Sequence, residues 1–300
     1  MALARALELP LARGKVRASF AALRPRPWTK NLLVFAGIVF AAEVDDWHRW
    51  VEAVVCFAAY CAASSAAYLA NDVRDVALDR LHPVKRLRPV ARGELSERGA
   101  ISLSLALVGA AIVLSALLGV WSFVLLLCFL GLQAAYSLGL KHVVLLDVAT
   151  IAALFVIRAA AGAVAVDVHI SPWLLVCTAL LALFLALSKR RAEISLVASR
   201  ATPGRPVLDG YSLELVDRLV EVLAVATVLV YAVYTLSAGN SRWMAVTIPF
   251  VAFGIGRYVW LVRGRGAGEE PEEVLLRDVP LLAAIVAWVV ACAAILLATG

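Results

Sequence analysis

Nine apolar stretches run through this chain, and most of them approach the ~20 residues that a helix needs to cross a bilayer. They cover residues 28–44, 50–70, 99–118, 121–139, 143–166, 172–188, 214–237, 243–262 and 279–298. The first is the weakest, because its apolar part runs only from Leu32 to Val44. Backbone in lipid must satisfy its hydrogen bonds internally, so these stretches are expected to be helices. The sequence therefore predicts an all-α, polytopic membrane helical bundle of about nine transmembrane helices.

Composition excludes an ordinary soluble domain. Of the 300 residues, 63% are hydrophobic and 17% are charged, against roughly 45–50% and about 25% in soluble domains. The net charge of +6 would suit a nucleic-acid partner, but the basic residues lie in short loops between the apolar stretches, as membrane topology requires. We therefore expect a lipid bilayer and no nucleic acid as a partner, and residues 1–300 to form one integral membrane domain.

The distribution of Lys and Arg predicts the orientation. With the N-terminus inside, the cytoplasmic segments hold 24 of the 28 basic residues, and the outer loops hold only Arg49 and Arg242. Because basic residues concentrate on the cytoplasmic side, we expect a cytoplasmic N-terminus and an external C-terminus in the inner (cell) membrane. No removable signal peptide is expected. The two long loops, 71–98 and 189–213, then share the cytoplasmic face.

The clearest chemical signal is an acidic cluster at the cytoplasmic end of the second apolar stretch. Asn71 is followed by Asp72, Asp75 and Asp79, and on a helix this i, i+3, i+7 spacing places the three carboxylates on one face. Three anions on one face repel one another unless a cation joins them. Hard oxygen ligands favour Mg²⁺, which typically binds through one or two carboxylates together with substrate phosphates. The alternative is a solvated helix end with incidental aspartates.

A basic segment follows the acidic cluster directly. It contains Lys85, Arg86 and Arg88, whose side chains could neutralise the phosphate oxygens that a metal leaves uncovered. Positive-inside topology alone would also account for its charge.

Several motifs resemble those of the UbiA superfamily of intramembrane prenyltransferases. They are Asn71-Asp-x-x-Asp75-x-x-x-Asp79 with His82-Pro83-x-Lys85-Arg86-x-Arg88-Pro89, then Arg24-Pro25-x-Pro27-Trp28-x-Lys30-Asn31, and Tyr136-Ser-x-x-x-Lys141. The resemblance spans the whole chain, agrees with nine spans, and implies a Mg²⁺-dependent enzyme whose active site faces the cytoplasm.

The second acidic motif of that superfamily is absent. Typical members carry another Asp-x-x-x-Asp at the end of the sixth span, where this chain reads Ser188-Lys-Arg-Arg-Ala-Glu193. Asp217 and Glu221 have the same mutual spacing but lie in the next span.

This departure resembles one branch, the decaprenyl-phosphate phosphoribosyltransferases of actinobacterial cell-wall (arabinan) synthesis. The branch motifs it matches are Phe155-Val-Ile-Arg158-Ala-x-Ala-Gly162, Ile170-Ser171-x-Trp173 and Lys189-Arg190-x-x-Glu193. The resemblance implies transfer of 5-phosphoribose from 5-phosphoribosyl diphosphate (PRPP) to a polyprenyl phosphate, with release of pyrophosphate. One acidic site suits the single diphosphate, and basic residues suit the two monophosphates.

The expected site combines the acidic cluster with basic and polar residues from several of these motifs. Asp72, Asp75 and Asp79 are the expected catalytic residues and Mg²⁺ ligands. The residues expected to contact substrate are Lys30, Asn31, Tyr68, Asn71, Lys85, Arg86, Arg88, Tyr136, Lys141, Arg158, Lys189, Arg190 and Glu193.

Several alternatives stay open at this stage. Lys30 could instead snorkel to the membrane interface, Tyr68 could be an interfacial tyrosine, and Arg158 could form a structural ion pair within the bundle. Asp147 could close the polar pocket or cap a helix. The chain as a whole could be a conventional prenyltransferase acting on an aromatic or small acceptor, or a transporter or lipid-binding scaffold. The chain could also assemble as a homo-oligomer.

Overall fold

A computed structural model describes residues 14–40, 46–82, 84–169, 171–200, 206–237, 242–264 and 271–299. Every regular element in these ranges is a helix, which confirms the all-α class. Within the described residues, seven helices are long and apolar enough to cross a membrane, and Val279–Ile295 is a shorter apolar helical segment. The seven are Trp47–Arg74, Glu97–Leu117, Val120–Leu138, Leu146–Ala165, Pro172–Val197, Leu213–Leu236 and Arg242–Gly264.

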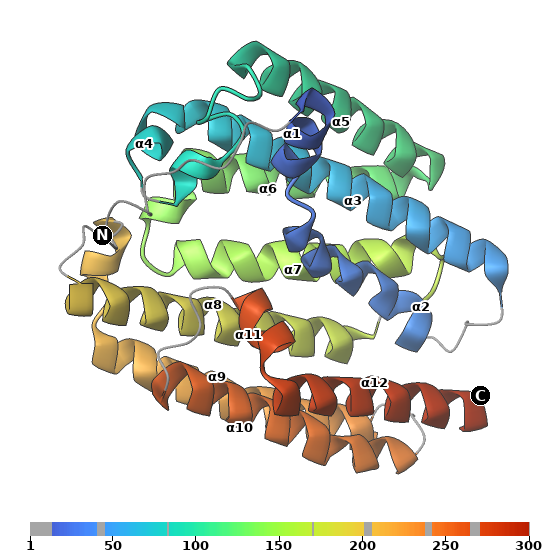
Figure 1. The fold of residues 1–300 in the computed structure, drawn as a ribbon. Coiled ribbons are helices and arrows are strands. Elements are labelled where there is room, and N and C mark those ends of the chain that lie inside the picture. The colour runs from blue at the N-terminus through green and yellow to red at the C-terminus, as the bar shows by residue number, and fades with distance from the viewer. Residues whose placement is uncertain are drawn as a thin grey trace. The chain divides into compact units, whose positions relative to one another are not determined.

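The helices that Figure 1 draws divide into two compact units. The first comprises residues 1–31 and 55–130, and the second comprises residues 32–54 and 131–300. The single catalytic domain expected over residues 1–300 stays a prediction.

The first unit holds most of helix α3 and the helices that flank it. Its elements are α1 (Lys15–Ala22), α3 (Trp47–Arg74, from residue 55), α4 (Val76–Leu81), the 3₁₀ turn η3 (Lys85–Leu87), α5 (Glu97–Leu117) and α6 (Val120–Leu138, to residue 130). Leu69 of α3 packs in a small core with Ala22, Val90 and Ala100. The Ser104 hydroxyl of α5 donates to the Ala66 carbonyl of α3 at 2.9 Å. These contacts fix the end of α3 against the loop that follows it.

The second unit contains the rest of the bundle. Its principal helices are α2 (Ala36–Phe40), α7 (Leu146–Ala165), α8 (Pro172–Arg200), α9 (Leu213–Ser237), α10 (Ile248–Gly264), α11 (Pro271–Arg277) and α12 (Val279–Thr299), with 3₁₀ turns η4 (Leu140–His142), η5 (Pro206–Gly210) and η6 (Arg242–Thr247). Helix α8 packs between α7 and α9, and α10 packs between α9 and α12. Phe184, Val216, Tyr258 and Leu261 are central residues of its apolar core.

The first expected span is built differently from the others. It consists of a 3₁₀ helix, η2 (Arg26–Phe35), followed by α2, and residues 41–44 of the expected span lie outside the described ones. A 3₁₀ helix rises ~2.0 Å per residue and an α-helix ~1.5 Å. Placed end to end, the two elements would extend roughly 28 Å, close to the ~30 Å hydrocarbon thickness. The first span stays a prediction, because these elements are not among the helices long and apolar enough to cross a membrane.

Small residues hold this segment against α7. A Cβ atom on Gly162 would lie 1.8 Å from the Val34 carbonyl oxygen, and one on Gly37 would lie 2.7 Å from the Ala163 Cα. Both distances are too short for real atoms, so only glycine fits at these two crossings. Close approach through small residues is the usual way in which membrane helices pack.

Candidate active site

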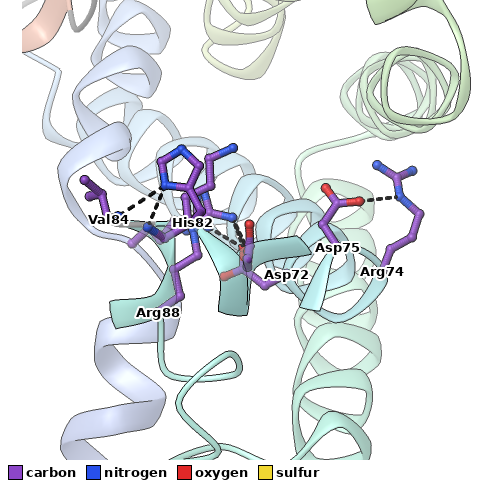
Figure 2. Close-up of polar contacts among 9 residues, drawn as sticks. Asp72, Arg74, Asp75, His82, Val84 and Arg88 are labelled. Atoms are coloured by element: carbon purple, nitrogen blue, oxygen red, sulfur yellow. Dashed lines mark hydrogen bonds and ion pairs between the residues drawn. The ribbon is translucent and has the colours of Figure 1, made fainter. Parts of the chain in front are cut away.

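The acidic cluster lies where helix α3 ends. The spacing suggested one helix through all three aspartates, but α3 stops at Arg74, the chain turns at Asp75 (φ −96°, ψ 10°), and α4 begins at Val76. The turn separates the carboxylates. Asp72 and Asp79 are 1% and 3% exposed, whereas Asp75 is half-buried and accepts a hydrogen bond from Arg74 Nε at 3.2 Å. Figure 2 shows Asp75 directed toward Arg74, apart from Asp72.

One guanidinium group joins the two buried carboxylates. Arg88 Nη1 donates to Asp79 Oδ2 at 2.5 Å and to Asp72 Oδ1 at 3.2 Å. Because a single nitrogen reaches both, oxygens of Asp72 and Asp79 converge on one point, although seven positions separate them in sequence. The structure thus brings together three residues that the sequence nominated for the site.

Arg24 is a further residue of this cluster, and it is not among the site residues expected from the sequence. Its guanidinium group pairs with Asp72 and lies over the Tyr68 ring, 5.1 Å from the centroid. Burial lowers the pKa of Arg24, and an arginine remains charged in proteins nonetheless. The one feature of the sequence that could have indicated Arg24 as a site residue is its position at the start of the Arg24-Pro25-x-Pro27 motif.

The backbone of Arg24 is strained. Helix α1 ends at Ala22, and Arg24 follows with φ +53°, a left-handed conformation that glycine usually supplies after a helix. In an L-residue this conformation costs roughly 1–2 kcal/mol. Strain of this kind often accompanies function, and here it coincides with the pairing of Arg24 and Asp72.

The donor set of this cluster fits a hard divalent cation. Asp72 Oδ2 is buried and has no hydrogen-bond partner, and oxygens of Asp72 and Asp79 already converge on one positively charged group. Carboxylate oxygens are the ligands that Mg²⁺ prefers. The described residues contain no group of three or more His, Cys, Asp or Glu side chains placed to hold a metal. Two protein carboxylates fit a Mg²⁺ that receives its remaining ligands from water and substrate phosphates.

The other expected residues of the first unit fall into two groups. Tyr68 lies in the cluster through its contact with Arg24. Lys85 and Arg86 precede Arg88 in sequence and are half-buried in η3, and Arg86 Nε is buried without a partner. Asn71 is half-buried one residue before Asp72. Asn31 and Lys30 belong to η2 instead. The Asn31 amide is fully buried and donates to Cys61 Sγ at 3.3 Å, three turns of α3 before Asp72.

The second unit brings several expected residues together at the start of α7. Arg190 is 1% exposed and pairs with Glu193, while its Nε donates to Asp147 Oδ2 at 2.7 Å. Tyr136 is close enough to interact electrostatically with Arg190. The positive charge of Arg190 is therefore balanced by two acids of its own unit. Lys189, the preceding residue, is half-buried.

Tyr211 completes this group, and no sequence pattern indicated it. Its hydroxyl donates to Asp147 Oδ1 at 2.6 Å and accepts from the Leu145 amide at 2.8 Å. Burial, with the hydrogen bond to Asp147, raises the pKa of Tyr211 to about 12. The hydroxyl therefore stays protonated at neutral pH and remains a donor. The Asp147 carboxylate therefore accepts hydrogen bonds both from Arg190 of α8 and from Tyr211, which lies just before α9.

Arg158 lies away from this group, about 16 Å further along α7 at 1.5 Å per residue. It is 6% exposed, donates to the Leu154 carbonyl at 2.9 Å and lies over the Phe155 ring at 5.5 Å. These contacts are with its own helix. Lys141 is half-buried in η4, between Tyr136 and α7.

Asp217 and Glu221, the acids in the span after α8, form ion pairs with arginines of neighbouring helices. Asp217 accepts from Arg191 Nε at 2.6 Å, and Glu221 pairs with Arg263 at 2.6 Å. These ion pairs join α8, α9 and α10, so Asp217 and Glu221 act as a structural link in this unit.

Over the residues that the structure describes, the fold and these clusters define a multi-pass, all-helical membrane protein with a buried carboxylate pair in the first unit and a buried polar network around Asp147 in the second. The sequence matches the UbiA prenyltransferase family over residues 32–277, and the chain belongs to this family. The shared fold is also seen in a UbiA homologue from Archaeoglobus fulgidus bound to GPP and Mg²⁺, which matches 93% of this chain and 99% of its own with a TM-score of 0.71 and 19% identity.

Two relatives are similar over nearly their whole length. The decaprenyl-phosphate phosphoribosyltransferase of Mycolicibacterium smegmatis is 38% identical over 284 residues, covering 89% of each chain. The protein of the same name from Mycobacterium tuberculosis is 35% identical over 280 residues, covering 89% of this chain and 90% of its own.

Proposed function

We propose that this protein transfers 5-phosphoribose from PRPP to a polyprenyl phosphate and releases pyrophosphate, as a step toward a cell-wall arabinan precursor. The observation that carries the proposal is the likeness to two phosphoribosyltransferases over 89% of this chain. The charge distribution supports it. Lys189 and Arg190 replace the second acidic motif, which a second diphosphate-bound metal would require.

The chemistry needs little from the protein beyond binding and orientation. A phosphate monoester is already anionic at neutral pH, so its oxygen can attack C1 of the ribose without a strong general base. The new C1–O bond forms as the bond from C1 to the diphosphate oxygen breaks, and the electron pair leaves with pyrophosphate. When bound, Mg²⁺ would stabilise that leaving group.

The carboxylates of Asp72 and Asp79 are the proposed holders of the metal, and Asp75 is predicted to join them when it turns from Arg74. Arg88 and Arg24 then have a second use, because a guanidinium group that pairs with a carboxylate also suits phosphate. The other proposed phosphate contacts are Lys85, Arg86, Lys141 and Lys189. Lys30, Asn31, Tyr68, Asn71, Tyr136, Arg158, Arg190 and Glu193 stay predicted substrate-binding residues.

The proposal places this reaction on the cytoplasmic side of the cell membrane, where a water-soluble phosphorylated donor is available. It follows from the 24 basic residues that the expected inner segments contain. A homo-oligomer is compatible with it.

The proposal is tested by transfer of label. Purified protein in detergent is incubated with PRPP radiolabelled in the ribose, decaprenyl phosphate and Mg²⁺. We expect label in the organic phase and release of one pyrophosphate for each lipid labelled. An organic phase without label, under conditions in which the M. smegmatis relative transfers it, would contradict the proposal.

A further inference from the structure

Asp147 lies at the centre of a buried polar network in the second unit. It is fully buried at the start of α7. One carboxylate oxygen accepts from Arg190 of α8 at 2.7 Å, and the other accepts from the Tyr211 hydroxyl at 2.6 Å. One side chain therefore connects α7 with two segments that are distant in sequence.

The segment that carries Tyr211 is packed firmly. Val207, Leu208 and Tyr211 are 3%, 7% and 5% exposed, so the residues just before α9 belong to the core of the unit. A Cβ atom on Gly210 would lie 2.4 Å from the Val144 side chain. The segment thus lies directly on the turn between η4 and α7, and glycine permits that approach.

The same turn is held in an uncommon backbone conformation. Leu145 has φ +67°, which a residue with a branched side chain rarely adopts, and its amide donates to the Tyr211 hydroxyl at 2.8 Å. Tyr211 therefore holds both the carboxylate of Asp147 and the strained peptide two residues before it. Buried networks of this kind are strong when every member is satisfied and weaken sharply when one is lost.

The elements joined by this network are those that carry the proposed phosphate contacts of the second unit. Lys141 belongs to η4, four residues before Leu145, and Lys189 precedes Arg190 on α8. Arg190 itself is enclosed by Asp147 and Glu193, so its charge fixes the turn of α8 that also carries Lys189.

We infer that Asp147 and Tyr211 are positioning residues, which fix the Lys141 turn and the α8 turn that carries Lys189 at the separation that phosphate binding requires. This inference rests on the proposed function, since that function makes Lys141 and Lys189 phosphate contacts. Neither Asp147 nor Tyr211 touches the reacting atoms. Their loss raises KM for a phosphate-bearing substrate more than it lowers kcat, because binding geometry is disturbed while the chemistry is unchanged.

The discriminating experiment compares two tyrosine variants of the full-length protein. Tyr211→Phe removes the hydroxyl of the network. Tyr231→Phe is the matched control: Tyr231 is 6% exposed in the same unit, contacts Thr247 at 2.6 Å, and accepts from Trp288 at 2.8 Å. Both changes remove one buried hydroxyl that has at least two hydrogen-bond partners, and the Tyr231 hydroxyl also lies 4.0 Å from Cys292 Sγ. A purely structural effect should therefore be no smaller in Tyr231→Phe than in Tyr211→Phe.

We expect KM for PRPP or for decaprenyl phosphate to rise about 10-fold in Tyr211→Phe, with kcat changed less than threefold and thermal midpoints of the two variants alike. Asp147→Asn, which keeps the shape of the side chain, should repeat the effect. KM values of Tyr211→Phe within twofold of those of Tyr231→Phe, for both substrates, would overturn the inference.

A second measurement separates this inference from the proposed function. Amide hydrogen exchange in residues 140–147 should quicken in Tyr211→Phe and not in Tyr231→Phe, whether or not the protein turns over PRPP. If the wild-type protein transfers nothing from PRPP, the proposed function fails. The exchange measurement then tests by itself whether Tyr211 holds residues 140–147 in place. Equal exchange in both variants rejects the positioning role.

Discussion

Asp72 is enclosed by cationic partners, with Arg24 and Arg88 both paired to its buried carboxylate. Removing one member of a buried ion pair usually costs 3–5 kcal/mol, because the other charge is left uncompensated. Variants at this position therefore need to keep the shape of the side chain, so that an effect on catalysis can be separated from an effect on folding.

Asp72→Asn should lower turnover about 10³-fold, which corresponds to ~4 kcal/mol of transition-state stabilisation. The amide keeps the size of the side chain but is a poor Mg²⁺ ligand. The assay is initial rate against Mg²⁺ concentration, with thermal midpoint measured in parallel. Glu97→Gln, an exposed acid in the first turn of α5, is the control and should behave as wild type. A fully active Asp72→Asn with an unchanged Mg²⁺ requirement would remove Asp72 from the metal site.

Arg24 allows charge and backbone strain to be tested separately. Arg24→Ala and Arg24→Gly both remove the guanidinium group, so activity should fall about 10- to 100-fold in each, as expected for the loss of a charge-assisted contact. Only glycine adopts φ +53° without strain. Arg24→Gly should therefore be about 1 kcal/mol more stable than Arg24→Ala. Equal stability of the two variants, measured by thermal denaturation in detergent, would argue against strain at this position.

At the scale of elements, the contact of η2 with α7 depends on the absence of a side chain at Gly162. Its Cβ would meet the backbone oxygen of Val34, and backbone cannot move aside as a flexible side chain can. This requirement explains why the Phe155–Gly162 motif ends in glycine. The motif is recognisable in the sequence, but the reason for its glycine is visible only in the structure.

Gly162→Ala should destabilise the protein by about 3 kcal/mol, at the upper end of the usual cost of overpacking. Gly256→Ala is the control, since a Cβ there meets nothing within 4 Å in the interior of α10; it should be neutral or stabilising by up to ~1 kcal/mol. The measurement is the thermal midpoint of each variant in the same detergent. Similar midpoints for both would mean that η2 and α7 do not pack as closely as described.

The helices themselves were predictable, because a bilayer leaves a long apolar segment no other way to satisfy its backbone. The break at Asp75 was not, since the i, i+3, i+7 spacing suits a continuous helix equally well. The bridge from Arg88 to Asp72 and Asp79 also escaped prediction, because it depends on how the loop after α4 folds back. Tyr211 lies 64 residues from Asp147 in sequence, and only tertiary structure joins them.

At the scale of the whole molecule, the expected orientation follows from the distribution of charge and is open to direct measurement. A cysteine-free variant with a single cysteine at Ser96 should react with a membrane-impermeant maleimide only when the cytoplasmic face is exposed. One at Asp46 should react from outside intact cells. Both positions are exposed. Reaction of the Ser96 position from outside would reverse the proposed topology and, with it, the side of the membrane on which the reaction takes place.

The central claim concerns the donor, because the same fold is seen in a UbiA homologue that is bound to GPP. The most direct test offers wild-type protein two donor and acceptor pairs, PRPP with decaprenyl phosphate and geranyl diphosphate with a phenolic acid, at equal Mg²⁺, and identifies the products by mass spectrometry. We expect decaprenyl phosphoryl-5-phosphoribose and no prenylated aromatic compound. A prenylated aromatic product, with PRPP left unused, would contradict the account and establish a conventional prenyltransferase.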